Sequence, residues 1–202
     1  MTKSEKYQNL EKKVNFIQEL DKLKSVYRRG LIKYDDNRRE NTAEHSWHVA
    51  LTGIILQEYA SGDIDVLKVL KMLLIHDLVE IYAGDTYAFD NHEILAEQNI
   101  KELEALEKVF SLLPESEAQE YKTLWLEFEE GDTLEAKFSK AIDRVVPVFQ
   151  NMQNNGGSWT AYGKVPKEKV VKRNIGLKYI APELWQYVEN QLDIAWQRGW
   201  LV

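Results

Sequence analysis

The chain of 202 residues contains no cysteine. This absence excludes disulfide bonds, thiolate metal ligands and cysteine nucleophiles, so any bound metal must be held by histidines and carboxylates. The sequence also lacks an apolar stretch approaching the roughly 20 residues that span a bilayer, and its first residues, MTKSEKYQNLEKK, lack the apolar core of a secretory signal. We therefore expect a cytoplasmic protein with no membrane partner.

Positive charge is also scarce. The sequence has 26 basic and 33 acidic residues, which gives a net charge of −7 and a pI near 5.3. Nucleic-acid polymers and anionic membranes are bound through basic surfaces that displace counterions, so neither is an expected partner. A phosphate ligand would need a local source of positive charge. A bound divalent ion can supply it, because the ion is often the largest charge in its site.

Helix-breaking residues are few, with four prolines and ten glycines. Leucine, isoleucine and valine recur at helical rather than alternating spacing, which predicts an all-α protein. Apolar residues make up 44% of the sequence, enough to bury a core. After NNGGSW only about 45 residues remain, too few for an independent core. We therefore predict a single compact multi-helix domain over residues 1–202, with C-terminal helices over about 156–202 packed on the same core.

The first 60 residues are expected to contain two helices. Apolar residues at intervals of three or four predict a helix over about residues 4–26, which should pack along one apolar stripe. Residues 27–41, YRRGLIKYDDNRREN, hold a glycine and a dense polar cluster, which indicates a connecting loop. A helix cap at Asn41 or Thr42 then begins a second helix that extends to about Tyr59.

A strongly apolar third helix, about residues 66–84, contains the adjacent pair His76 and Asp77. Burying an unpaired carboxylate in such a helix costs several kcal/mol, so a cation, a hydrogen-bonded partner or a metal is expected there. A metal would satisfy both side chains. His45 and Asp143 are the candidate ligands from other helices. Two imidazoles and two carboxylates suit manganese, iron, cobalt, nickel, zinc or magnesium, and the donor set does not choose among them.

Two acids downstream extend this group of residues. Glu80 lies four residues after His76 and therefore projects from a neighbouring position on the predicted helix. It is placed to orient or deprotonate a metal-bound water, whose pKa the ion lowers towards neutrality. Asp85 follows at the helix end, where it could hold a substrate hydroxyl or shuttle a proton.

Each of these residues also has a purely structural interpretation. His76 and Asp77 could form a buried hydrogen-bonded pair, and Asp143 could pair with an arginine or lysine. Glu80 could be a solvated helix residue, and Asp85 a turn residue at the end of the helix. A histidine placed like His45 is, taken alone, more often an ordinary helix-terminal residue than a ligand.

Three segments of the sequence resemble the HD superfamily, and in particular the small 5'-deoxynucleotidases within it. The segments are RRENTAEHSWHVA, LLIHDLVEIYAGDT and AKFSKAIDRVVPVFQN, and the resemblance spans roughly residues 20–155. It implies a helical HD-domain fold, a divalent ion, and commonly a homodimer. The metal ligands that it implies are His45, His76, Asp77 and Asp143, and its further acidic active-site positions correspond to Glu80 and Asp85.

One segment departs from the family pattern. Relatives often have a tryptophan near the N-terminal loop, whereas Leu31 stands there in YRRGLIKY. We expect Arg28 or Arg29 to contact the substrate phosphate, and we leave the preferred base and sugar open.

The resulting hypothesis is hydrolysis of the phosphomonoester of a small nucleotide, a deoxynucleoside 5'-monophosphate, by metal-activated water. A phosphodiesterase or nucleoside-triphosphate hydrolase would use the same site. A non-catalytic helical binding module with a structural metal is the alternative from another class.

Overall fold

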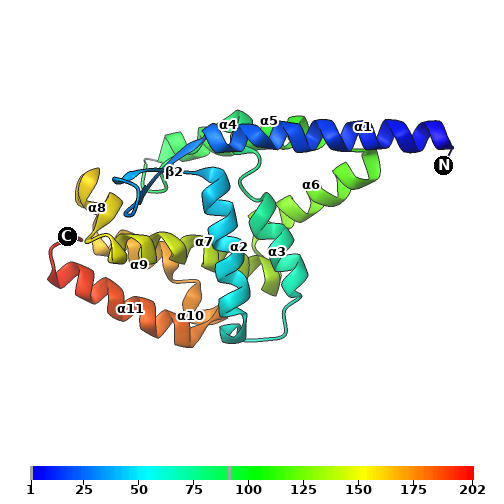
Figure 1. Cartoon of the computed structure of the whole chain (residues 1–202). Coiled ribbons are helices and arrows are strands. Elements are labelled where there is room, and N and C mark those ends of the chain that lie inside the picture. The colour runs from blue at the N-terminus through cyan, green and yellow to red at the C-terminus, as the bar shows by residue number, and fades with distance from the viewer. Residues whose placement is uncertain (1, 91) are drawn as a thin grey trace.

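The computed structural model describes residues 2–90 and 92–202 and is helical, with one short β-hairpin (Figure 1). The all-α prediction is confirmed. Within the described residues, no helix is both long and apolar enough to cross a membrane. The elements are α1 (Lys3–Glu19), η1 (Leu20–Ser25), β1 (Tyr27–Ile32), β2 (Arg38–Asn41), α2 (Thr42–Leu56), η2 (Gln57–Tyr59), α3 (Val66–Ile75), α4 (Glu80–Ala83), α5 (His92–Phe110), α6 (Glu115–Glu130), α7 (Leu134–Gln153), α8 (Gly157–Ala161), α9 (Lys167–Asn174), α10 (Leu177–Ile180) and α11 (Pro182–Gln197).

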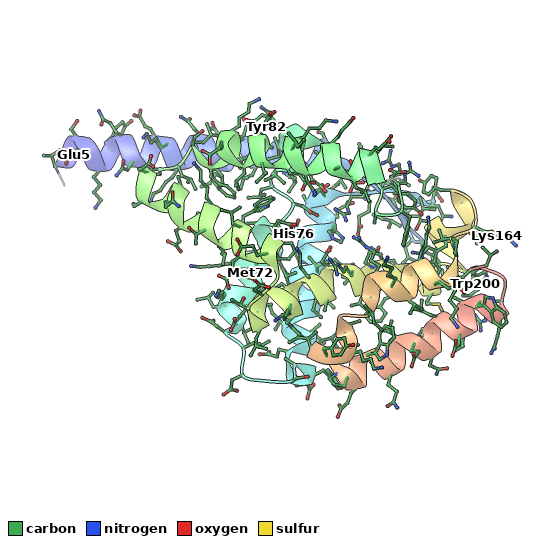
Figure 2. The ribbon with its side chains drawn as sticks, turned by 180° about the vertical axis from the view of Figure 1, so that it is seen from behind. Glu5, Met72, His76, Tyr82, Lys164 and Trp200 are labelled. Atoms are coloured by element: carbon green, nitrogen blue, oxygen red, sulfur yellow. The ribbon has the colours of Figure 1, made fainter. Side chains whose placement is uncertain are left out.

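Helix α3 lies between two hydrophobic clusters. Its residue Leu73 packs in a cluster with side chains from α2, α7, α10 and α11, while the adjacent Met72 packs with side chains from η1, α5 and α6. A helix that is buried on two sides needs apolar residues on both, which explains Val69, Met72, Leu73 and Ile75. Leu67 and Leu74 lie on its exposed side. His76 follows this helix directly and lies in the interior near Met72 (Figure 2). The pair of His76 and Asp77 therefore lies in the interior of the molecule.

Helix α1 is the element whose packing differs most from the prediction. It begins at a capping box in which Thr2 and Glu5 exchange hydrogen bonds, but no residue of α1 is buried. The side chains of Leu10 and Ile17 are 55% and 65% exposed. The helix projects past the remaining elements at its N-terminal end (Figure 1). The C-terminal end of the helix packs against the core through Phe16, whose ring centroid lies 6.2 Å from that of Phe110, and the chain continues into η1 with Leu20 and the buried Leu23. The predicted packing is therefore wrong for the N-terminal part of the helix.

Residues 27–41 form an antiparallel hairpin rather than the predicted connecting loop. Leu31 pairs with Arg39, and an irregularity interrupts the register between Tyr27 and Leu31. The turn is made by Asp36 and Asn37, which adopt positive φ angles of 49° and 57°; short polar side chains of this kind tolerate the left-handed region. The strands are rich in arginine instead of β-branched residues, so their composition did not predict them.

Candidate active site and metal centre

The cap of helix α2 fixes the position of His45. Asn41 is the N-cap, and its side chain accepts from the Glu44 N–H while the Glu44 carboxylate accepts from the Asn41 N–H. This confirms the predicted start of the helix. Arg38 from β2 donates two hydrogen bonds to the Glu44 carboxylate, at 2.9 and 2.6 Å. His45 is the next residue, and its side chain is fully buried.

The predicted helix over residues 66–84 is interrupted at the histidine–aspartate pair. Helix α3 ends at Ile75, and the Glu80 N–H bonds to the Asp77 carbonyl at 3.0 Å, three residues back instead of four. The His76 carbonyl, which would accept from Glu80 in a continuous helix, instead accepts from Trp125 Nε1 at 2.8 Å. A tryptophan from α6 therefore replaces a helical hydrogen bond at this position.

The four predicted ligands converge in the interior. His45 Nε2 lies 3.0 Å from Asp143 Oδ1, and His76 Nε2 lies 3.5 Å from the same oxygen. The ligand atoms of these three residues all lie within 4.8 Å of one another. Asp77 Oδ2 lies beside this group, 3.1 Å from His76 Nε2 and 3.9 Å from His45 Nε2. The structure thus brings side chains from α2, α7 and the turn after α3 to one point.

These contacts keep both aspartates ionised. Burial alone would raise the pKa of Asp77, but the charges of His76 and Arg28 lower it to about 2. Burial also opposes ionisation of Asp143, yet its hydrogen bond with His45 and the neighbouring imidazole of His76 hold its pKa well below the ordinary value. At neutral pH both side chains are carboxylates, the form that binds a divalent cation.

The buried donor set fits a metal ion. His76 Nδ1 lies 2.9 Å from the Leu73 carbonyl, which only accepts, so Nδ1 donates and Nε2 is the ring nitrogen that faces the cluster. Burial opposes protonation of the ring, but the charge of Asp77 and contacts with Asp143 raise the pKa of His76 well above its ordinary value, so a metal ion bound here would displace a proton from Nε2. Nε2 is buried and has no hydrogen-bond partner among the described residues. A divalent cation would satisfy this nitrogen and balance the two carboxylates. His45, His76 and Asp143 would hold it together with Asp77, and the set of nitrogen and oxygen donors is borderline to hard in character.

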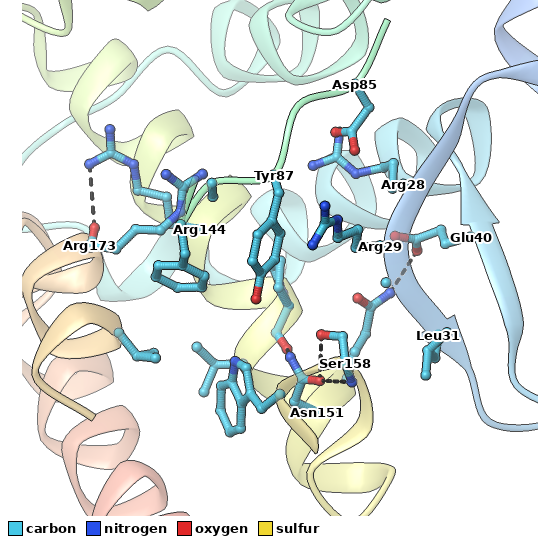
Figure 3. A pocket seen from close by; sticks show the side chains of 18 of the residues that line it. Arg28, Arg29, Leu31, Glu40, Asp85, Tyr87, Arg144, Asn151, Ser158 and Arg173 are labelled. Carbon is cyan, nitrogen blue, oxygen red and sulfur yellow. Dashed lines mark hydrogen bonds and ion pairs between the residues drawn. The ribbon is translucent and has the colours of Figure 1, made fainter. Parts of the chain in front are cut away.

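A second group of contacts surrounds Arg28, which comes from β1. Its Nη1 lies 2.6 Å from Asp77 Oδ2, 3.3 Å from Glu80 Oε1 and 3.5 Å from Asp85 Oδ1. Figure 3 shows the guanidinium of Arg28 next to Asp85. Burial lowers the pKa of Arg28, but the charges of the three carboxylates outweigh burial and raise the pKa above its ordinary value. Arg28 therefore joins the predicted catalytic acids to the predicted metal ligands.

Glu80 is buried in surroundings that favour the protonated form of its carboxyl group. Its Oε2 accepts a hydrogen bond of 2.7 Å from the Thr42 hydroxyl. Burial, followed by the charge of Asp77, raises the pKa of Glu80 well above its ordinary value. A carboxyl group with a raised pKa next to a metal centre is suited to proton transfer near neutral pH.

Glu40 is a site residue that the sequence did not reveal. It is buried, its Oε2 faces His45 Nδ1 at 3.5 Å, and its Oε1 accepts from Gln150 Nε2 at 2.6 Å. A Cβ at Gly30 would lie 3.1 Å from Glu40 Oε2, so glycine leaves room for the carboxylate. Carboxylates behind a metal-binding histidine orient its ring and raise its basicity. Within the charged run RREN, nothing in the residue pattern distinguishes Glu40 from its solvated neighbours.

Replacing Glu40 with glutamine is expected to lower metal affinity by about 10- to 100-fold, because the partner of His45 Nδ1 loses its charge. Titration of the metal-free protein with Mn²⁺ measures the effect. Glu58→Gln, an exposed glutamate in η2, is the matched control and should leave metal affinity unchanged. Equal metal affinities for Glu40→Gln and the unmodified protein would contradict this role.

A pocket of about 810 Å³, counting the space open to solvent, lies beside the cluster. Arg28, Glu40 and Asp85 line it on the side of the predicted acids. The guanidinium of Arg29 lies 4.3 Å from the ring centre of Tyr87, a cation–π contact that holds it at the pocket wall. Leu31 also lines the pocket. Further apolar lining comes from Ala88, Phe89, Pro147, Val148, Trp159 and Val170.

The sequence and the fold identify the class of protein. The model of the HD domain family matches residues 20–185, so the chain belongs to the HD domain family. The predicted resemblance is confirmed.

Individual relatives narrow the comparison. The human 5'-deoxynucleotidase HDDC2 is 28% identical over 137 residues, which cover 68% of this chain and 65% of the human protein. The Schizosaccharomyces pombe 5'-deoxynucleotidase hdd1 is 29% identical over 171 residues, covering 79% of this chain and 84% of that protein. A protein from Magnetospirillum magnetotacticum MS-1, named a predicted metal-dependent phosphohydrolase, superposes with a TM-score of 0.89 and 40% identity over 96% of both chains.

Proposed function

We propose that this protein is a metal-dependent phosphohydrolase that releases phosphate from deoxynucleoside 5'-monophosphates, and that residues 1–202 form one domain. One observation carries the proposal. His45, His76 and Asp143 present ligand atoms within 4.8 Å of one another, and the acids Glu80 and Asp85 meet this cluster through Arg28. The names of the human and S. pombe relatives support the choice of substrate.

The proposed roles follow from the contacts. His45, His76, Asp77 and Asp143 hold the ion, which when bound supplies a nucleophilic hydroxide and polarises the phosphate. Glu80 takes up and holds the proton from the attacking water, aided by its raised pKa.

Three further side chains act on the substrate. Asp85 accepts a hydrogen bond from a substrate hydroxyl. Arg28 and Arg29 contact the phosphate that is released. Leu31 lines the pocket where relatives often have a tryptophan, so an aliphatic side chain would face the nucleotide at this position.

The test is a screen over deoxynucleoside and nucleoside monophosphates, the matching triphosphates and a dinucleotide, crossed with manganese, cobalt, iron, nickel, zinc and magnesium. The expected result is release of inorganic phosphate that depends on the added ion. Chromatography of the products separates this reaction from the alternatives, since a phosphodiesterase would release a nucleotide fragment and a triphosphate hydrolase would release a polyphosphate. Inactivity on all monophosphates, with every ion, would refute the proposal.

We also propose that two copies of the chain associate through helix α1. Its exposed apolar stripe, which includes Leu10, Val14 and Ile17, lies on a helix that projects from the body of the molecule (Figure 1). Exposed contiguous apolar surface of this kind marks interaction sites, and a second copy is the occupant that fits a family in which homodimers are common.

Ile17→Lys is expected to convert the protein from dimer to monomer, because it places a charge in the proposed interface. Light scattering coupled to size-exclusion chromatography measures the molar mass. Ile55→Lys on α2 is the matched control, because Ile55 is 62% exposed and Ile17 is 65% exposed. A monomeric unmodified protein, or dimers that both variants leave intact, would count against the α1 interface.

A further inference from the structure

Two arginines on the pocket wall have no acidic partner. Arg144 from α7 and Arg173 from α9 both line the pocket. In residues 2–90 and 92–202, no described carboxylate lies within 4.0 Å of either guanidinium, and the contact between the two residues is a 3.4 Å hydrogen bond from Arg144 Nη1 to the Arg173 carbonyl. Both arginines are half-buried, and partial burial of a charged group without a partner is still unfavourable. A pair of such groups in a protein of net charge −7 therefore calls for an external anion.

The surroundings of Arg173 increase this cost. Burial lowers the pKa of Arg173, and the positive charges of Arg144 and Arg28 lower it further against the opposing charge of Asp143. Arg28, by contrast, is balanced by Asp77, Glu80 and Asp85. Arg29 also has no carboxylate within 4.0 Å among the described residues, but its guanidinium lies against the ring of Tyr87. Arg144 and Arg173 are therefore the pocket arginines for which the described residues supply neither an acid nor an aromatic ring.

The two kinds of arginine occupy different parts of the pocket. In Figure 3, Arg28 and Arg29 lie on one side of Tyr87, and Arg144 and Arg173 lie on the other. Asn174 lines the same wall as Arg173. Its buried Oδ1 has no hydrogen-bond partner among the described residues, while its Nδ2 donates to the Val170 carbonyl at 2.9 Å. This part of the pocket offers two cationic groups and one acceptor for a hydroxyl.

We propose that Arg144 and Arg173 bind a second phosphate group of the substrate, one that is not released, so that the preferred substrate is a doubly phosphorylated nucleotide. The inference rests on the proposed phosphohydrolase activity and extends its preferred substrate from the monophosphate to a nucleotide with a second phosphate. Arg28, beside the residues that would hold the ion, contacts the phosphate that leaves, and Asn174 accepts a hydrogen bond from a sugar hydroxyl. The second phosphate is either on another position of the sugar or adjacent in a phosphate chain, and the test distinguishes these two sources.

The experiment compares kcat/KM for a deoxynucleoside 5'-monophosphate, the matching 3',5'-bisphosphate and the matching 5'-diphosphate. At least one doubly phosphorylated substrate is expected to exceed the monophosphate by about tenfold or more, the size of one or two charge-assisted hydrogen bonds. A faster 3',5'-bisphosphate would place the second phosphate on the sugar, and a faster 5'-diphosphate would place it in the phosphate chain. Arg173→Gln should lower kcat/KM for that substrate by about tenfold more than for the monophosphate, through KM. Arg198→Gln, an exposed arginine outside the pocket, is the charge-matched control.

Two further measurements separate the outcomes. The melting temperature of Arg173→Gln should equal or exceed that of the unmodified protein, because the substitution removes a half-buried charge that has no acidic partner. Binding of the bisphosphate and monophosphate to Glu80→Gln is then compared by calorimetry. The same binding comparison is made with the double variant that also carries Arg173→Gln. If the bisphosphate binds more tightly than the monophosphate only when Arg173 is present, while the unmodified protein hydrolyses no nucleotide, the subsite is supported and the proposed function is refuted. Equal kcat/KM values for all three substrates would overturn the subsite. It would also be overturned if Arg173→Gln lowered kcat/KM equally for the monophosphate and the doubly phosphorylated substrates and lowered the melting temperature.

Discussion

Replacing His45 with alanine is expected to abolish phosphate release and to leave the purified protein without bound metal. The reason is geometric, since His45 Nε2 lies 3.0 Å from Asp143 Oδ1 and is one of the three converging ligand atoms. Loss of one imidazole removes a ligand from the ion that activates the attacking water, so the expected decrease in kcat is on the order of a thousandfold or more. Metal content is measured by plasma mass spectrometry and activity by phosphate release with added manganese or cobalt.

His48 provides the matched control, because it lies three residues further along the same helix. Its ring is half-buried and contacts the ring of Trp47, with centroids 6.1 Å apart. His48→Ala should therefore retain both metal and activity. Treatment of the unmodified protein with a chelator should reproduce the His45→Ala phenotype, and added divalent ion should reverse it. If His45→Ala retained stoichiometric metal and full activity, the assignment of this ligand would be wrong.

Glu80→Gln is expected to retain metal but lose roughly 10²- to 10⁴-fold in kcat, the usual contribution of a general acid or base. Glutamine has nearly the same shape and can keep a hydrogen bond with the Thr42 hydroxyl, which lies 2.7 Å from Glu80 Oε2. It cannot take up a proton from water. Phosphate release and metal content, measured on the same preparation, separate the loss of proton transfer from the loss of the ion.

Thr42→Val is the companion variant, because it keeps the carboxyl group and removes its hydroxyl partner. We expect a smaller loss than in Glu80→Gln, together with a shift of the pH profile, since the hydrogen bond from Thr42 favours the ionised acid. A non-catalytic binding module with a structural metal would behave differently. In that case Glu80→Gln and Thr42→Val would both bind the nucleotide ligand as the unmodified protein does, and no nucleotide would be hydrolysed.

The sequence by itself determined the helices and the identities of the converging side chains. The periodicity of apolar residues and the Asn41 cap act over three or four residues, so the start of α2 and the position of His45 on it could be predicted. The apolar run before His76 predicted a buried pair for the same reason. The match to the HD domain family from residue 20 to residue 185 agrees with that analysis.

Only the tertiary structure decided how these elements meet. The break after Ile75 depends on Trp125, which lies 49 residues away in sequence from His76 and donates a hydrogen bond to its carbonyl. The role of Glu40 depends on Gln150, 110 residues distant. Whether Arg144 and Arg173 have acidic partners, and whether the stripe of α1 is covered, likewise depends on which distant elements pack beside them. Caps and periodicity are local properties of the chain, whereas burial, ion pairing and access to a ligand are set by contacts between residues far apart in sequence.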